Sequence, residues 1–255
     1  MPLEPLAVPF GYKLKPQYRQ GLVGHWKMNV NGGNILPDLS GNNNHGTLTN
    51  FGWTTTSGWG GQCCIFDGIN DCIFQVSNDT LNLGNIFTIS AWIFPKLLNS
   101  TQVIWGKINT VGDGCKFEIS ASNNTIEIYS TSINGVKVAN SNILILNLWQ
   151  HVAVSADGTY FNFYHNGKSV GSSAYSSFSF VNTQPASIGS RNDQTGQYFN
   201  GLIDDVRTYK QRALSADEIA HSCFQQEDEW NFGEDEALDN PVPIIAYQER
   251  LRRSS

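Results

Sequence analysis

The stretch Trp149-Gln-His-Val-Ala-Val-Ser-Ala-Asp-Gly-Thr-Tyr-Phe-Asn-Phe-Tyr-His-Asn-Gly-Lys-Ser-Val170 decides the fold class. Apolar and polar residues alternate over 149–155 and again over 160–165. Asp157-Gly158 separates the two runs, and Asn166-Gly167 comes directly after the second. Asp-Gly and Asn-Gly pairs favour the tight turns of β-hairpins, because their residues adopt positive φ angles readily. The stretch therefore predicts three consecutive antiparallel strands.

Similar short runs fill the chain from about residue 21 to residue 213, at 21–26, 64–66, 71–76, 87–94, 116–120, 125–129 and 198–209. The longest alternating run, 87–94, places residues 87, 89, 91 and 93 on one face and ends at Pro95, which cannot continue a central ladder. A capping box, Ser215-Ala-Asp-Glu218, predicts one short helix at about 216–223, with Ile219 and Phe224 as its packing contacts. Many strands and one helix predict an all-β fold, a sandwich of two antiparallel sheets.

The composition is that of a folded domain that does not bind nucleic acid. Charged residues make up only 15% of the 255, and the chain carries 7 Trp, 9 Tyr and 14 Phe, which bury large apolar areas. This excludes a disordered chain. The net charge of -6 repels phosphate. Residues 225–255 hold 8 acids and 3 bases, a net of -5, so the remaining 224 residues are almost neutral at -1.

The charge distribution and the prolines divide the chain into three parts. Residues 1–20 are rich in proline and predict an extended arm, residues 21–224 form the β domain, and residues 225–255 form an acidic linker and a tail. The tail ends in an apolar, proline-bearing segment followed by arginines. It is either a docking peptide or a frayed end. The docking candidates are Ile244, Ile245, Tyr247, Arg250, Arg252 and Arg253.

The chain has no segment that predicts membrane insertion or export. No apolar run approaches the roughly 18–20 residues of a membrane span. Met1-Pro-Leu-Glu-Pro-Leu6 lacks the basic and apolar regions of a signal peptide, so we expect a cytoplasmic protein or one carried on a particle. The five cysteines, at 63, 64, 72, 115 and 223, are odd in number and have no CxxC spacing, which predicts free, buried thiols.

Several motifs then succeed one another in a distinctive order: Gly21-Leu-Val-Gly-His-Trp26, Asp38-Leu-Ser-Gly-Asn-Asn-Asn-His-Gly-Thr-Leu-Thr49, Phe66-Asp-Gly-Ile-Asn-Asp71, Phe199-Asn-Gly-Leu-Ile-Asp-Asp-Val-Arg-Thr-Tyr209 and Ala213-Leu-Ser-Ala-Asp-Glu-Ile219. Over residues 21–224 the chain resembles the LamG-like (laminin G / concanavalin A-like lectin/glucanase) jelly-roll domains of the bacterial and phage-associated type. The resemblance implies two antiparallel sheets packed face to face. Function stays open, because such folds host lectins, glycan-binding modules, glycosidases and structural domains.

The resemblance also implies a structural calcium ion. In the superfamily the acidic residue before the Val-Arg of the last strand often holds calcium, which corresponds here to Asp204, with Asp205 beside it. Calcium takes six to eight oxygen ligands, and Asp38, Asn42 and Asp67 would add donors if their loops converge. The alternative for Asp67 is a role in forming its turn.

Loop aromatics supply the candidate ligand contacts. Trp53, Trp59, Trp105 and Tyr198 lie in or near predicted loops, where an exposed ring could stack on a sugar. The alternative is that these rings only cap the ends of the sandwich.

The sequence predicts no enzyme. A glycosidase on this fold would need two carboxylates about 5–10 Å apart across a cleft. The Glu-x-Asp-x-x-Glu motif of the fold's hydrolases does not occur in the chain. Glu118 and Glu127 are the best remaining pair, and their alternation with apolar neighbours predicts a surface that faces solvent.

Two functions remain. The first is a structural or attachment protein on the surface of a particle, such as a phage virion decoration or fibre-type subunit, oligomeric and anchored to other subunits by both arms. The second is a free-standing carbohydrate-binding or adhesion module, with glycans as partners and calcium as a structural ion. Neither function involves nucleic acid or a membrane span.

Overall fold

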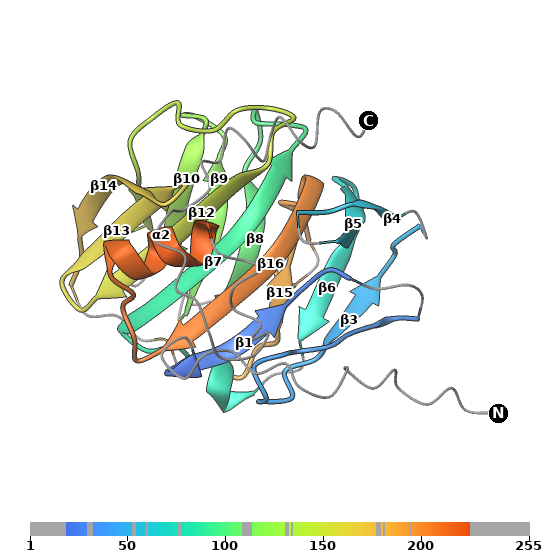
Figure 1. Cartoon of the computed structure of the whole chain (residues 1–255), viewed down its shortest axis with the longest axis horizontal. Helices are drawn as coiled ribbons and strands as arrows, with labels where there is room; N and C mark the ends of the chain where they lie inside the picture. The colour runs from blue at the N-terminus through green and yellow to red at the C-terminus, as the bar shows by residue number, and fades with distance from the viewer. Residues whose placement is uncertain are drawn as a thin grey trace, which may run out of the picture.

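Two antiparallel sheets make up the computed structural model (Figure 1), which describes residues 19–29, 33–52, 55–59, 61–75, 78–108, 114–130, 133, 135–176, 180, 182–193 and 195–224. Sheet A has the strand order β14-β13-β12-β7-β16-β5-β4, and β1 also pairs with β16. Sheet B has the order β11-β10-β9-β8-β15-β6-β3-β2. The predicted all-β sandwich is therefore confirmed.

Sheet A consists of β1 (Leu22–Trp26), β4 (Thr55–Ser57), β5 (Gln62–Asp67), β7 (Ile86–Pro95), β12 (Gln150–Asp157), β13 (Tyr160–His165), β14 (Lys168–Ala174) and β16 (Asn200–Lys210). Sheet B consists of β2 (Ile35–Leu36), β3 (Gly46–Thr49), β6 (Cys72–Gln75), β8 (Gln102–Ile108), β9 (Gly114–Ser120), β10 (Thr125–Ser130), β11 (Gly135–Val138) and β15 (Ala186–Ile188). The helical elements with bounds inside the described residues are the 3₁₀ turn η1 (Asp79–Leu81) and the helix α2 (Ala216–Phe224).

The hairpins predicted from turn chemistry are present. Asn166 and Gly167 have φ angles of 49° and 73°, and they join β13 to β14. Gly158 has a φ of 98° in the turn between β12 and β13. There the carboxylate of Asp157 accepts the amide hydrogen of Tyr160 at 2.7 Å. These positive φ angles match the residue types found at each turn.

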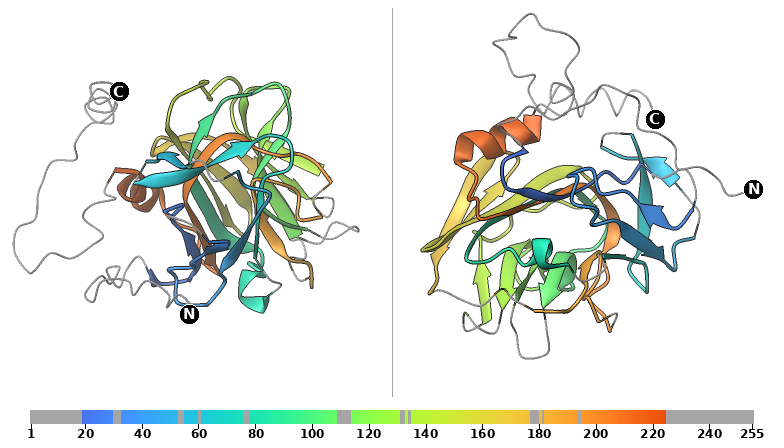
Figure 2. Two further views of the ribbon diagram at one scale, coloured as in Figure 1. Left: turned by 90° about the vertical axis from the view of Figure 1, so that its right-hand side faces the viewer. Right: turned by 90° about the horizontal axis from the view of Figure 1, so that it is seen from below.

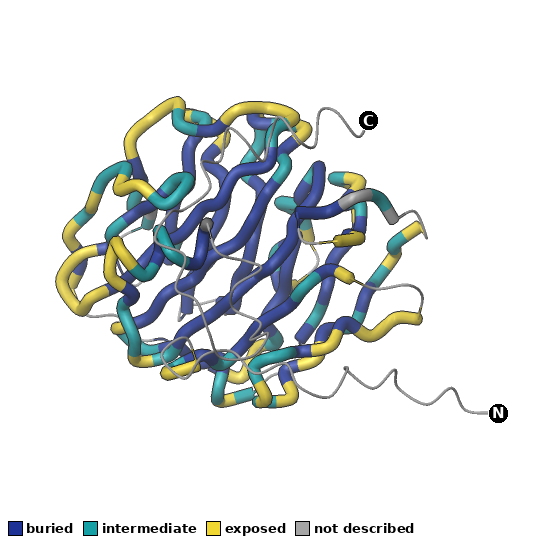
Figure 3. Tube along the Cα trace, in the orientation of Figure 1, coloured by how far each residue is buried: buried dark blue, intermediate teal, exposed yellow. Residues whose placement is uncertain are grey.

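The main core lies between the two sheets, where buried strands run through the middle of both layers (Figure 3). Phe87, Ile89, Ala91 and Ile93 of β7 belong to this core, as their alternation predicts. The other face of sheet A carries a smaller apolar cluster, formed by Leu22, Ala153, Tyr164, Tyr209, Leu214 and Ile219. Sheet A is thus buried on both faces along β7.

Helix α2 supplies part of that second cluster and lies on the face of sheet A that points away from sheet B (Figure 2). Its first turn forms the predicted capping box. The Glu218 amide donates to Oγ of Ser215 at 3.2 Å, and the Ser215 amide donates to Oε2 of Glu218 at 2.9 Å. Ile219 is fully buried, whereas the side chain of Phe224 lies outside the described residues.

The polar motif from Asp38 to Asn44 lies along the outer edge of β1. The His25 amide donates to Oδ1 of Asp38 at 2.9 Å, and the Leu39 amide donates to the His25 carbonyl at 2.8 Å. The Asn44 side-chain amide donates to the Val23 carbonyl at 2.7 Å. The loop therefore satisfies the backbone groups that β1 would otherwise present unpaired.

The five cysteines are buried and free of disulfides, as predicted. Across the described ranges, no helix has the length and hydropathy needed to cross a bilayer. Apart from residues 19 and 20, the N-terminal arm lies outside the described residues, as does all of 225–255 with its six docking candidates. Anchoring through the arms therefore stays a prediction.

Candidate functional site

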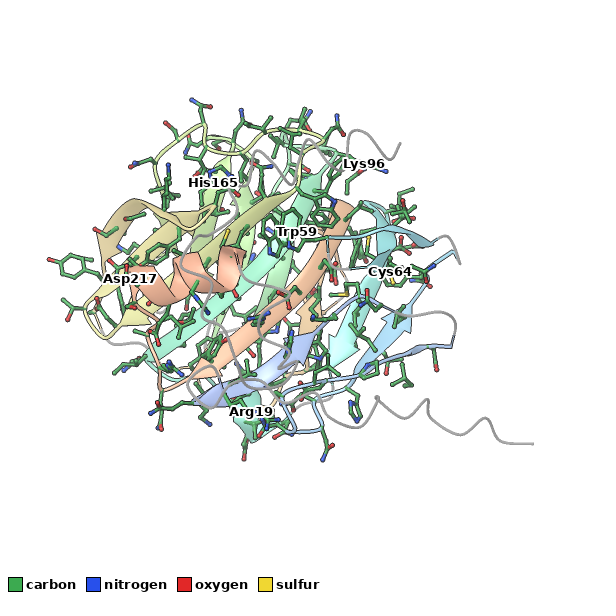
Figure 4. The ribbon with its side chains drawn as sticks, viewed as in Figure 1. Arg19, Trp59, Cys64, Lys96, His165 and Asp217 are labelled. Atoms are coloured by element: carbon green, nitrogen blue, oxygen red, sulfur yellow. The ribbon has the colours of Figure 1, made fainter. Side chains whose placement is uncertain are left out.

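The aromatic residues predicted to contact ligand differ in where they lie and in how far they are buried. Trp105 is fully buried in β8, with its ring 6.3 Å from that of Phe180, so the prediction that it lies in a loop and contacts ligand is wrong. Trp59 stacks on Trp92 over sheet A, with ring centroids 3.4 Å apart, and only 7% of it is exposed (Figure 4). Tyr198 is half-buried, and Trp53 lies outside the described residues.

The residues predicted to bind calcium have partners of their own. The carboxylate of Asp38 accepts the amide hydrogens of His25, Ser40 and Asn44 at 2.9 to 3.0 Å. The side-chain amide of Asn42 donates to the Leu22 carbonyl at 3.2 Å. These two residues hold the edge of β1.

Asp67 is the last residue of β5 and borders the turn that leads to β6. Its Oδ1 accepts the amide hydrogens of Ile69 and Asn70 at 2.7 and 3.1 Å, which is the turn-forming role. Within the described part of the chain, no three His, Cys, Asp or Glu side chains are placed to share a metal ion. Calcium binding at these residues stays a prediction.

Asp204 and Asp205 lie in a bulge of β16 rather than on a regular strand. The pairing of β16 with β7 shifts between Asp204 and Arg207, and Asp205 has a φ of 48°. Asp205 binds the guanidinium of Arg207 through both oxygens, at 3.1 and 2.9 Å, and its Oδ1 lies 2.7 Å from Nε2 of His25. All three residues of this buried ion-paired group are at most 4% exposed.

The charges within this group compensate one another. Burial alone would raise the pKa of Asp205, but Arg207 and the hydrogen bond from His25 hold it well below its ordinary value. Burial lowers the pKa of His25. The group therefore has a structural role in joining β1 to β16.

A second group of polar side chains lies on the face of sheet B that points away from the core. Lys116 and Glu118 of β9 and Glu127 and Tyr129 of β10 alternate with core residues, and Gln197 reaches them from the loop before β16. Sequence reasoning placed the two glutamates in solvent, but Glu118 is 1% exposed and Glu127 is 6% exposed. We call these five residues the polar cluster.

The geometry of the polar cluster is tight. Nζ of Lys116 lies 3.0 Å from Oε2 of Glu118, donates to Oε1 of Gln197 at 2.7 Å, and lies 4.4 Å from the ring centre of Tyr129. Glu118 and Glu127 are directly opposite in the β9–β10 pairing and share a hydrogen bond. The Val103 amide donates to the Gln197 carbonyl at 3.0 Å, which holds the loop against β8.

Burial and like charge favour the protonated forms of the two glutamates. Burial raises the pKa of Glu118 to about 7 against the opposing effect of Lys116, and Glu127 raises it further. Burial also raises the pKa of Glu127. The Glu118 carboxyl is therefore only partly ionised near neutral pH. Ionisable groups with shifted pKa values that lie outside the core mark a candidate functional site.

The Glu118 proton should make stability fall as pH rises. The native state keeps this proton up to about pH 7, whereas an ordinary glutamate loses it near 4.5, so the unfolded state binds fewer protons between these values. In the wild type, the free energy of unfolding should fall by about 3 kcal/mol as the pH rises across that window, and Glu118→Gln should abolish this fall. Urea unfolding of both proteins from about pH 5 to about pH 8 measures the difference. Burial raises the pKa of Asp71 to about 6, so Asp71 also makes stability depend on pH. Its contribution is the same in both proteins and cancels in the difference between them. Parallel pH profiles for the two proteins would contradict the expectation.

The comparisons with known proteins agree with this architecture. A family model described as the concanavalin A-like lectin/glucanases superfamily matches residues 70–220. Domain 4 of AbnA, an extracellular GH43 arabinanase from Geobacillus stearothermophilus solved in complex with arabinotriose, is similar in structure, with a TM-score of 0.63, 20% identity, and coverage of 78% of this chain and 96% of that one. No curated protein matches the sequence.

Two toxin binding domains are also similar in fold. The binding domain of Paraclostridial Mosquitocidal Protein 1 gives a TM-score of 0.60 at 20% identity, with 81% of this chain and 52% of that chain covered. The binding domain of botulinum neurotoxin serotype G gives 0.58 at 18%, with 80% and 51% covered. The chain thus spans about half of each toxin domain. Because the family model matches 151 of the 255 residues, this chain belongs to the concanavalin A-like lectin/glucanase superfamily.

Proposed function

We propose that this chain is a non-catalytic carbohydrate-binding module, and that the polar cluster on sheet B is its glycan site. One observation carries the proposal. Lys116, Glu118, Glu127 and Tyr129 lie on the face of sheet B that does not contribute to the main core. Burying such groups is unfavourable unless they are paired. Sequence and packing together thus maintain a group of paired polar side chains at this place.

The side chains of the polar cluster suit the chemistry of sugars. Sugar hydroxyls both donate and accept hydrogen bonds, and the cluster offers Lys116 as a donor, Glu127 as an acceptor and the Gln197 amide as both. Tyr129 is half-buried and provides an aromatic ring for the apolar face of a sugar. Tyr198, a ligand contact predicted from the sequence, is half-buried and comes directly after Gln197.

The two glutamates favour binding over hydrolysis. A glycosidase positions its carboxylates on either side of the scissile bond, with room for the sugar between them. Glu118 and Glu127 instead lie opposite each other on neighbouring strands and share a hydrogen bond, and Glu118 is paired with Lys116. The fold neighbours are described as domains of an arabinanase and as toxin binding domains, which supports a binding role.

A tyrosine comparison tests the glycan site. We expect the wild-type protein to bind members of a printed array of plant, bacterial and animal glycans. Tyr129→Ala should weaken that binding about tenfold, because the sugar loses its stacking partner. The matched control is Tyr160→Ala, which removes a 46% exposed ring from β13 of sheet A and should leave the affinity unchanged. Equal affinities for the wild type and Tyr129→Ala, or no glycan binding at all, would contradict the proposal.

A further inference from the structure

The charges of the polar cluster do not balance when every group is ionised. One lysine faces two glutamates, and all three are at most 6% exposed. The described residues directly opposite the two glutamates on the flanking strands add no charge: β8 places Val103 opposite Glu118, and β11 places Val138 opposite Glu127. The loop before β16 contributes the uncharged Gln197. The cluster is therefore neutral when one of the two carboxylates is protonated, and it carries one negative charge when both are ionised.

The loop beside the cluster does not change this balance. Arg191 lies at the other end of the loop that carries Gln197, and its guanidinium pairs with Asp193 at 2.8 Å. The Arg191 amide donates to the Gly196 carbonyl at 3.2 Å, which closes the loop. The arginine charge is thus already matched by a carboxylate, and both side chains remain open to water, at 43% and 41% exposure.

We propose that the polar cluster selects uncharged glycans and rejects glycans that carry carboxylate groups. The inference rests on the proposed glycan site and names its ligand class. An acidic sugar placed over Tyr129 would face the Glu118–Glu127 pair, while the nearest cation, Lys116, is already engaged by Glu118 and Gln197. A carboxylate brought to this site would lose its hydration without gaining a free cation, and burying an unpaired charge is strongly unfavourable. An uncharged sugar has no such desolvation penalty.

Oligogalacturonides and their methyl-esterified forms provide a matched test, since they share sugars and linkages and differ in whether the C6 carboxyl group is ionised or esterified. On a printed array we compare each neutral series with its acidic counterpart: methyl-esterified oligogalacturonides with oligogalacturonides, and xylo-oligosaccharides with their glucuronic acid-substituted forms. We expect the wild type to bind the neutral member of at least one pair, and the acidic member about tenfold or more weakly. The double variant Glu118→Gln/Glu127→Gln leaves Lys116 unopposed and should reduce this preference to about twofold or less. Thermal unfolding of the double variant establishes that it is folded.

The outcomes separate this inference from the proposed function. Equal or tighter binding of the acidic members by the wild type would overturn the inference and leave the glycan site in place. An unchanged preference in the folded double variant would also overturn it, because the discrimination would then arise elsewhere. Absence of binding to every glycan on the array, neutral and acidic, would contradict both the site and its selectivity. Preferential binding of neutral members that is lost in the double variant supports both.

Discussion

Replacing Arg207 with methionine is expected to lower the free energy of unfolding by about 3–5 kcal/mol. The guanidinium is 2% exposed and holds both oxygens of Asp205, which is itself 4% exposed. Methionine keeps much of the side-chain volume but leaves the carboxylate without its strongest partner, and His25 alone cannot replace it because burial lowers the pKa of that imidazole. An uncompensated buried charge is among the most destabilising changes in a folded protein. Urea unfolding near neutral pH measures the loss.

Arg191→Met is the matched control for Arg207→Met. It removes the same kind of side chain from an ion pair of similar length, 2.8 Å against 2.9 Å, but the Arg191 pair is more than two-fifths exposed. Exposed pairs contribute about 0–1 kcal/mol, so the control should change stability by less than 1 kcal/mol. Similar losses in the two variants would show that the burial of the Arg207 pair has no special effect.

Gly201→Ala is expected to lower the free energy of unfolding by about 3 kcal/mol or more. Gly201 belongs to β16 and has a φ of 140°, a conformation that residues with a Cβ atom rarely adopt. A Cβ atom built there would lie 2.1 Å from the Phe94 carbonyl oxygen. Since that oxygen belongs to the backbone of β7, neither strand can move without disturbing the centre of sheet A. Urea unfolding with an unchanged denaturant slope would assign the loss to the native state.

Gly84→Ala separates steric overlap from backbone strain. Gly84 also has a positive φ, 78°, but a Cβ atom there would have no neighbour within 4 Å. Gly84→Ala should therefore lower the free energy of unfolding by only about 1–2 kcal/mol, which is the cost of the left-handed conformation for a residue with a Cβ atom. A loss at Gly201 no greater than the loss at Gly84 would show that the close approach to β7 is relieved without penalty.

Local chemistry explains why the hairpins and the helix cap could be predicted. Asn166-Gly167 and the Ser215–Glu218 pair act over three or four residues, so their geometry is fixed by neighbours in the sequence. The alternation of β7 likewise identified its core face correctly. Each of these features depends on a contact that the sequence displays directly.

The errors arose where a distant segment or an irregular strand decides the outcome. Alternation placed Glu118 and Glu127 on the face of sheet B that points away from the core, which is correct, but it could not reveal that they would bury each other beneath Lys116 and Gln197. A bulge between Val103 and Trp105 directs both Ile104 and Trp105 into the core. A bulge adds a residue without any compositional mark and interrupts the alternation of a strand, so the sequence did not reveal β8 and Trp105 was predicted to lie in or near a loop.

The bulge in β16 had a similar effect on the predicted calcium ligands. Regular alternation would send Asp204 and Asp205 to opposite faces. Instead, the Asp205 amide donates to Oδ1 of Asp204 at 2.7 Å, and Asp205 turns toward Arg207 and His25. Aspartate tolerates a positive φ better than most residues, which permits this turn. The sequence thus identifies Asp204 and Asp205 as candidate site residues, but it does not reveal which side chains they contact.

The loop from Asp38 to Asn44 has a consequence for behaviour in crowded solutions. An unprotected edge strand recruits further strands from other molecules, and this is a common route to domain swapping and amyloid growth. Here the amide and carbonyl of His25 and the carbonyl of Val23 are already occupied from within the same chain. The outer edge of β1 is consequently closed to intermolecular strand exchange, even at high protein concentration.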